Sequence, residues 1–137
     1  MIMDKTILAP AQYGLLWKTS WLTTASALYA IHKKKYIDAM LLTSIFFTSL
    51  NFWRYPTISW RRTMDMSMVN IGILYQIHSA FSSKNRNGYM LLIGTGISSY
   101  YIGCQHYTKG NHWTYVYHHA GLHLFGNIAS FYLYSSK

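Results

Sequence analysis

Five apolar segments, each about 20 residues long, follow one another along the chain with only short polar gaps between them. They cover residues 13–31, 36–53, 63–81, 89–107 and 113–134. A helix of this length matches the thickness of the hydrocarbon core of a bilayer. Because the gaps are short, consecutive helices are expected to run antiparallel. The sequence predicts an all-α protein: a polytopic transmembrane bundle of about five antiparallel helices, forming one domain over residues 1–137.

The scarcity of charge favours the same interpretation. Charged residues make up 11% of the chain, against roughly 25% in ordinary soluble domains. The mean hydropathy of +0.06 is low for a membrane protein. We attribute that value to Tyr, Ser, Thr and His, which membrane helices tolerate. The expected location is integral to a membrane, with membrane lipids as partners.

Basic residues dominate the charge balance. The formal net charge is +9, from 12 Lys and Arg residues against Asp4, Asp38 and Asp65. Most basic residues lie in the gaps between apolar segments, where membrane proteins meet anionic headgroups. No nucleic-acid-binding module is recognisable, so nucleic acid is not an expected partner. A membrane protein partner or a homo-oligomer is expected instead.

The first apolar segment has an alternative interpretation as a cleaved signal peptide. Ala25-Ser26-Ala27 has the A-x-A form of a cleavage site. However, Lys18 interrupts the apolar region, and the preceding residues are barely basic. We therefore expect the segment to be a helix of the bundle.

Alternating helix directions bring several polar residues to one end of the predicted bundle. Ser49 lies near the end of the second segment, and Asp65 lies near the start of the third. His119 and His123 lie near the start of the fifth, four residues apart and so on one helix face. Two imidazoles at this spacing can bind one zinc ion when a third ligand comes from elsewhere. These four residues form the candidate site.

Each member of this set also has an ordinary structural interpretation. Asp65 follows Arg61 and Arg62 at the spacing of a helix-surface ion pair. Asp38 stands in the same relation to Lys34 and Lys35, which favours a structural role for both carboxylates. The histidine pair could equally bond to neighbouring Ser and Tyr side chains.

Ser49-Leu50-Asn51-Phe52-Trp53-Arg54, then Asp65, then His119-x-x-x-His123 resemble the alkaline-ceramidase-like superfamily of membrane hydrolases. The resemblance implies a helical fold with a zinc ion held by three histidines. It implies catalytic roles for Ser49 and Asp65, and metal-ligand roles for His119 and His123. This chain departs from the pattern because Arg54 stands where the first metal histidine is expected, and because the family has seven helices.

Three hypotheses for function follow. The first is a zinc-dependent hydrolase of a lipid amide or ester, in which Asp65 activates the metal-bound water and Ser49 helps to hold the oxyanion. The second is a non-catalytic membrane assembly, scaffold or envelope component that kept the fold without the metal. The third is a b-type haem carrier with histidine ligands, which no paired spacing within two long helices supports. The sequence leaves open whether the protein is an enzyme.

Overall fold

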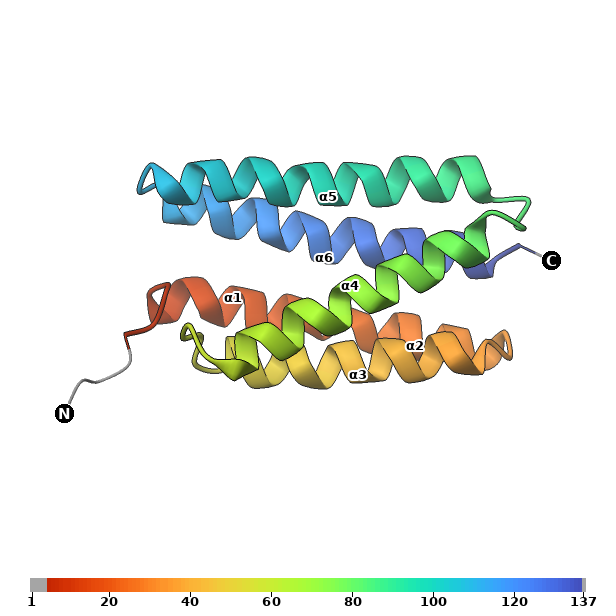
Figure 1. The fold of residues 1–137 in the computed structure, drawn as a ribbon, viewed down its shortest axis with the longest axis horizontal. Helices are drawn as coiled ribbons and strands as arrows, with labels where there is room; N and C mark the ends of the chain where they lie inside the picture. The colour runs from red at the N-terminus through yellow and green to blue at the C-terminus, as the bar shows by residue number, and fades with distance from the viewer. Residues whose placement is uncertain (1–4, 137) are drawn as a thin grey trace.

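The regular structure of the protein is helical throughout the residues described by the computed structural model, 5–136. The helices, in chain order, are α1 (Pro10–Ser20), α2 (Leu22–His32), α3 (Tyr36–Trp53), α4 (Trp60–Ala80), α5 (Arg86–Thr108) and α6 (His112–Tyr134). From α2 onward, consecutive helices alternate in direction along the long axis (Figure 1). The predicted all-α class is therefore confirmed.

The first predicted helix is interrupted at Trp21. The backbone N–H of Trp21 donates to the carbonyl of Lys18, three residues back, at 3.2 Å. On the preceding residue, the Ser20 hydroxyl donates to the carbonyl of Leu16 at 2.8 Å. The predicted 13–31 segment is therefore two helices, α1 and α2, of 11 residues each.

The prediction of membrane spans is wrong. Within residues 5–136, no helix combines the length and the apolar character needed to cross a bilayer. Helices α1 and α2 are too short, and the longer helices carry polar residues throughout, as in α4 with Asn70, Gln76 and His78. Each predicted apolar segment contains Tyr, Ser or Thr residues, and these residues lower its mean hydropathy. The transmembrane, multi-pass and integral-membrane assignments are corrected accordingly.

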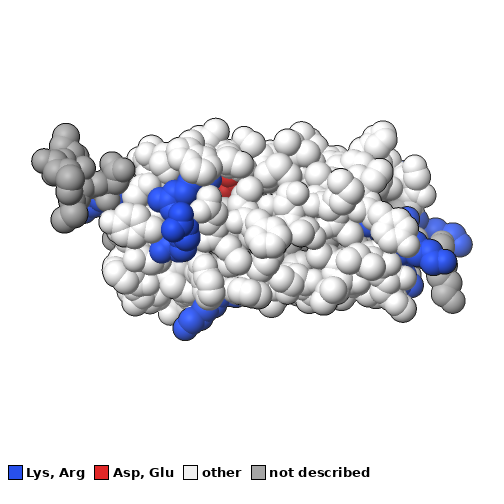
Figure 2. Space-filling view, turned by 90° about the horizontal axis from the view of Figure 1, so that it is seen from below, with Lys and Arg blue, Asp and Glu red and all other residues white. Residues whose placement is uncertain are grey.

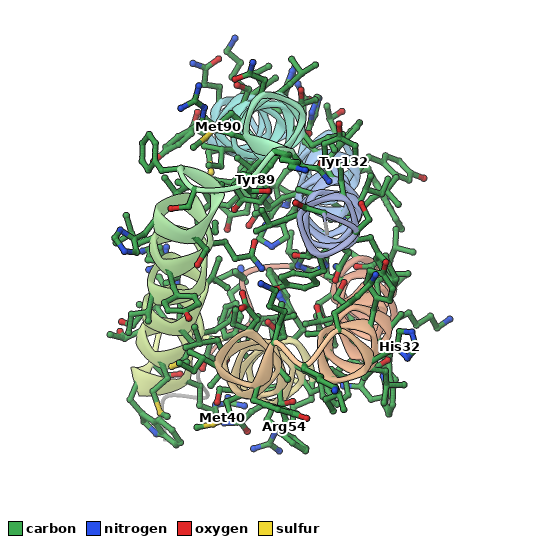
Figure 3. All side chains as sticks on the ribbon, turned by 90° about the vertical axis from the view of Figure 1, so that its right-hand side faces the viewer. His32, Met40, Arg54, Tyr89, Met90 and Tyr132 are labelled. Carbon is green, nitrogen blue, oxygen red and sulfur yellow. The ribbon has the colours of Figure 1, made fainter. Side chains whose placement is uncertain are left out.

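The helices form a ring around the long axis. Helix α6 packs against α5 and also against α1 and α2, and α3 packs against α2 and α4. Seen end-on, α4 lies on one side of the ring and α2 on the other (Figure 3). Helix α4 crosses the others diagonally and packs mainly on α3, with few contacts to α5 (Figure 1). The ring is therefore closed least tightly between α4 and α5.

Close packing of α5 on α6 depends on glycine. A Cβ added to Gly103 would lie 2.7 Å from the Cβ of His118, and one added to Gly96 would lie 3.2 Å from the Cβ of Phe125. These glycines allow the two backbones to approach closely. The pair α5 and α6 thus forms one closely packed side of the ring.

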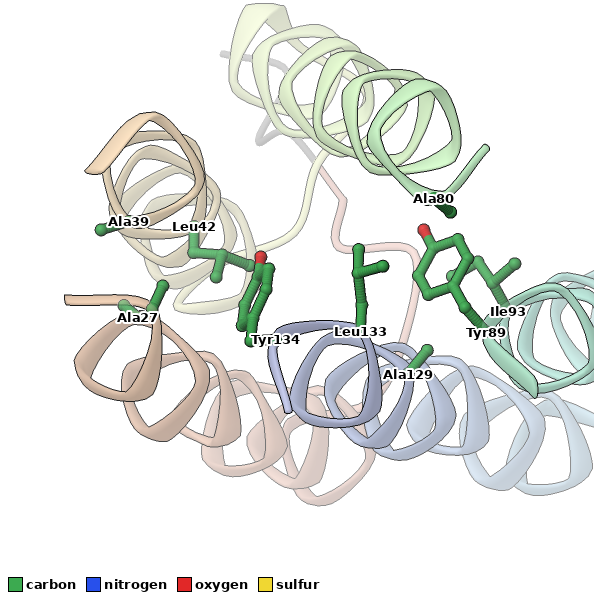
Figure 4. Packing of buried hydrophobic residues seen from close by; sticks show 10 residues of the cluster. Ala27, Ala39, Leu42, Ala80, Tyr89, Ile93, Ala129, Leu133 and Tyr134 are labelled. Atoms are coloured by element: carbon green, nitrogen blue, oxygen red, sulfur yellow. The ribbon is translucent and has the colours of Figure 1, made fainter. Parts of the chain in front are cut away.

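Apolar side chains fill both halves of the ring interior. At one end, Leu133, Tyr134, Tyr89 and Ile93 turn toward the centre between the helices (Figure 4). A second cluster around Leu16, Trp53 and other buried residues fills the opposite half. On the face shown in Figure 2, Lys and Arg gather toward the two ends and the middle is uncharged. Buried and half-buried polar side chains, among them Ser49, Asp65, His123 and Gln76, also face the interior of the ring.

Candidate functional site

A cavity of about 440 Å³ lies inside the ring. Most of its wall is apolar, and Leu42, Ile45, Val69, Ile73, Ile93 and Leu122 contribute to it. A few polar side chains from α3, α4 and α6 also line it, among them Ser49, Asp65, His119, His123 and Asn127. A mainly apolar cavity with a few convergent polar groups is the usual form of a small-molecule site.

The cavity opens between α4 and α5. The exposed residues that line it are Met66, Asn70 and Leu74 on α4, and Tyr101 on α5. All other lining residues are buried or half-buried. The opening therefore coincides with the loosest contact between neighbouring helices in the ring.

The structure brings Ser49 and Asp65 into direct contact. The Ser49 hydroxyl donates to Oδ1 of Asp65 at 2.6 Å, and the Thr48 hydroxyl approaches the same oxygen at 3.4 Å. Asp65 is only 7% exposed. Burial raises the pKa of Asp65 to about 6, although the two hydroxyls act in the opposite direction. The carboxylate is thus ready to exchange a proton near neutral pH.

Asp65 does not form the ion pair with Arg61 that the sequence spacing suggests. Arg61 donates to the backbone carbonyls of Asn51 and Tyr55, at 3.1 and 2.8 Å, so it binds the end of α3. Arg54 donates to the Asn51 side chain at 3.0 Å. No basic residue contributes to the pKa shift of Asp65. The carboxylate is stabilised by hydroxyls alone.

His119 and His123 are adjacent and both line the cavity. Their ring centroids are 4.9 Å apart, and the rings are nearly perpendicular. The Tyr115 hydroxyl lies 3.2 Å from Nδ1 of His119, and the Thr19 hydroxyl lies 2.7 Å from Nδ1 of His123. Burial lowers the pKa of His123 to about 4; burial, with His123 nearby, lowers the pKa of His119 well below its usual value. Both imidazoles are therefore neutral at pH 7.

The partners of Thr19 also assign the tautomer of His123. Thr19 bonds to the carbonyl of Leu16 at 3.1 Å, as a helical threonine does when it donates its single hydrogen. The Nδ1–H of His123 then donates to Thr19, and Nε2 of His123 keeps a lone pair.

These residues do not fit the zinc centre that the resemblance implies. In the part of the chain from residue 5 to 136, no three His, Cys, Asp or Glu side chains are gathered closely enough to hold a metal ion. Asp65 is engaged by Ser49, and Arg54 is bound to Asn51. We therefore derive no chemical step through a metal.

A second buried polar cluster extends from the cavity, whose wall includes Gln76 and Ser130, toward the opposite end of the ring. The Tyr134 hydroxyl donates to Oδ1 of Asp38 at 3.0 Å and accepts from Nε2 of Gln76 at 2.8 Å. The same Nε2 donates to Ser130 at 2.9 Å, and the Tyr89 hydroxyl donates to Oε1 of Gln76 at 3.0 Å. The network joins α3, α4, α5 and α6. The sequence does not predict this network, because Lys34 and Lys35 lie at ion-pair spacing from Asp38 and indicate a surface position.

Three residues that contact the two histidines were not identified from the sequence: Tyr115, Thr19 and Tyr100. Tyr115 holds His119 and lies four residues before it, so the i, i+4 pattern of His119, His123 and Asn127 could have been extended to include it. Thr19 holds His123 from a distant helix, and no local pattern indicates that contact. The lining Tyr100, whose ring centroid lies 5.3 Å from that of His119, gave no signal either.

Comparison with protein-family models, with curated proteins and with solved structures finds no match to this chain. The resemblance described above consequently rests on Ser49, Asp65, His119 and His123 alone.

Proposed function

We propose that this protein binds a small, mainly apolar molecule in the cavity between α3, α4, α5 and α6. The observation that carries the proposal is the cavity itself, with a volume of about 440 Å³ and an apolar wall interrupted by a few oriented polar groups. Its volume falls within the range of about 300–1,000 Å³ typical of small-molecule sites.

The polar groups support binding because their orientation is already set. Thr19 and Tyr115 hold the two histidine rings, and Ser49 holds Asp65. A ligand that enters the cavity would meet fixed hydrogen-bonding groups and would lose little free energy in ordering them. The loosely closed side between α4 and α5 provides a route into the cavity.

Glycine substitutions test the proposal directly. Gly126 lines the cavity, and a Cβ added there meets nothing within 4 Å. Gly126→Leu should therefore fill part of the cavity, and its Cβ meets no neighbouring atom. Gly94 is a matched control, because an added Cβ is equally free there and Gly94 does not line the cavity.

The measurement is equilibrium binding, by isothermal titration calorimetry, of three probes that share one body: 4-phenylbutylamine, 4-phenylbutanol and 4-phenylbutanoate. We expect saturable binding of at least one probe, weakened at least about tenfold by Gly126→Leu and unchanged by Gly94→Leu. Gly126→Ala, a smaller change, should weaken binding less. Absence of saturable binding, or equal weakening by both leucine variants, would refute the proposal.

A second candidate function is metal-free hydrolysis of an amide or an ester. It is favoured by the 2.6 Å contact between Ser49 Oγ and an aspartate whose pKa lies at about 6. In this mechanism Asp65 accepts a proton from the attacking group as general base. Turnover of a 4-nitrophenyl ester should then be lost in both Asp65→Asn and Ser49→Ala; turnover that persists in both variants would exclude it.

A further inference from the structure

The charge of Asp65 has no compensating cation within the described part of the chain. Burial and two hydroxyls determine its pKa, with no contribution from a basic residue. Asp38 differs, because the charge of Lys35 acts on it. A buried carboxylate is costly unless it is paired with a positive charge, so Asp65 is an anion that still lacks its partner.

One oxygen of Asp65 remains available to that partner. Ser49 and Thr48 both bond to Oδ1. Oδ2 has no hydrogen-bond partner within residues 5–136, and this atom is not fully buried. Because Asp65 lines the cavity, a molecule held there lies beside this carboxylate.

The two histidines that line the cavity add no positive charge to it. His119 and His123 are neutral at pH 7, because burial lowers the pKa of each. Nε2 of His123 offers a lone pair. Tyr100 and Tyr101 line the same cavity, and the face of an aromatic ring attracts a nearby cation.

We propose that the molecule bound in the cavity is a monocation, with an ammonium group that pairs with Oδ2 of Asp65 and an apolar body that fills the remaining volume. This inference rests on the proposed function, because it assumes that the cavity is a binding site. It adds the chemical class of the ligand, a lipophilic amine.

The three phenylbutyl probes separate this inference from the proposed function, because they differ only in the charge of the head group. The amine should bind at least about tenfold more tightly than the alcohol, and the carboxylate should bind most weakly. Asp65→Asn, which keeps the shape of the side chain, should abolish the preference for the amine. Asp38→Asn is the matched control and should leave the preference intact.

Each outcome has a defined meaning. Equal binding of amine and alcohol, both weakened by Gly126→Leu, would overturn the monocation and leave the cavity as a binding site. A preference for the amine that persists in Asp65→Asn would also overturn it. If no probe binds in a saturable way, the proposed function and this inference both fail. Near-ultraviolet circular dichroism of each variant verifies that the fold is retained.

Discussion

Asp38 and Asp65 begin from the same sequence pattern and reach different environments. Each lies near the start of a helix, three or four residues after a pair of basic residues. Both are buried, at 6% and 7% exposure. Asp38 accepts a hydrogen bond from Tyr134, a member of the network around Gln76, and lies within the field of Lys35. Asp65 is bound only by hydroxyls and lines the large cavity.

The difference shows how a structural carboxylate can be distinguished from a candidate functional one. Burial raises the pKa of both aspartates, so burial alone does not separate them. The two aspartates differ in what stabilises the negative charge. Asp38 lies near the cation Lys35 and belongs to a hydrogen-bond network that crosses the ring, whereas Asp65 has neither. Asp65 also lines a volume that a ligand can occupy.

The largest expected effect comes from breaking the network that holds Asp38. Gln76→Leu removes the acceptor of Tyr89 and the donor to Tyr134. We expect a loss of about 3 kcal/mol in the free energy of unfolding, because buried hydroxyls lose their partners. Urea denaturation provides the measurement. Asn70→Leu on the same helix, at an exposed position, should change stability by less than about 0.5 kcal/mol. Equal effects of the two changes would mean that the network is not structural.

The next effect is the pH-dependent cost of burying Asp65. Because burial raises its pKa from 3.8 to about 6, the folded protein binds this proton more tightly than the unfolded chain does. Stability therefore falls as the pH rises from about 4 to about 6, by up to about 3 kcal/mol. Asp65→Asn should be more stable than the native protein at about pH 8, and the difference should vanish near pH 4.

Asp38→Asn sharpens this comparison. It removes the same charge, but it also weakens the bond from Tyr134 and removes the partner of Lys35. We expect a smaller gain than for Asp65→Asn, or a loss, in urea denaturation at the same two pH values. A larger gain from Asp38→Asn would reverse the assignment of the two aspartates.

At pH values above about 5, an effect of opposite sign and smaller size is expected at His123. Burial lowers its pKa from 6.5 to about 4, so the unfolded chain takes up this proton first as the pH falls. The folded protein should lose about 2 kcal/mol of stability through this group between pH 6.5 and about pH 5. His123→Gln should remove that loss in thermal denaturation, whereas His78→Gln, at an exposed position on α4, should not. Identical pH profiles for the native protein and His123→Gln would contradict the buried, neutral state of this ring.

The smallest expected effect concerns the two hydroxyls on Asp65. The bond from Ser49 lowers the pKa of Asp65 and is much shorter than the bond from Thr48, 2.6 against 3.4 Å. Ser49→Ala should therefore raise the pKa of Asp65 above about 6, and Thr48→Val should raise it less. Carbon-13 NMR titration of the side-chain carboxyl measures both shifts. A pKa that is unchanged in Ser49→Ala would show that the contact has no influence on the carboxylate.

The helical segments themselves were predictable because their signal is local. The predicted 36–53 segment coincides with α3, and α6 begins one residue before the predicted 113–134 segment. Apolar runs bounded by Gly, Pro and charged gaps define such helices without reference to the rest of the fold. The division at Trp21 was not predictable in this way, because it is a change in backbone hydrogen bonding, from the carbonyl four residues back to the one three residues back, at a position without Gly or Pro.

The candidate site was predictable only in part. Alternating helix directions predict that Ser49 and Asp65 lie at similar depth, and the i, i+4 rule places His119 and His123 on one face. Neither argument determines what a side chain touches. The contact between Thr19 and His123 joins residues 104 positions apart, and no periodicity within a segment contains that information.

The helical character of this protein follows from local sequence, because helix formation depends on residues within a few positions of one another. Which of two similar aspartates lines a cavity depends on the folded arrangement of the helices. Hydrogen-bond partners and burial depend on helix rotation and on the gap between α4 and α5. Both are set by packing across the whole ring, which a local pattern does not encode.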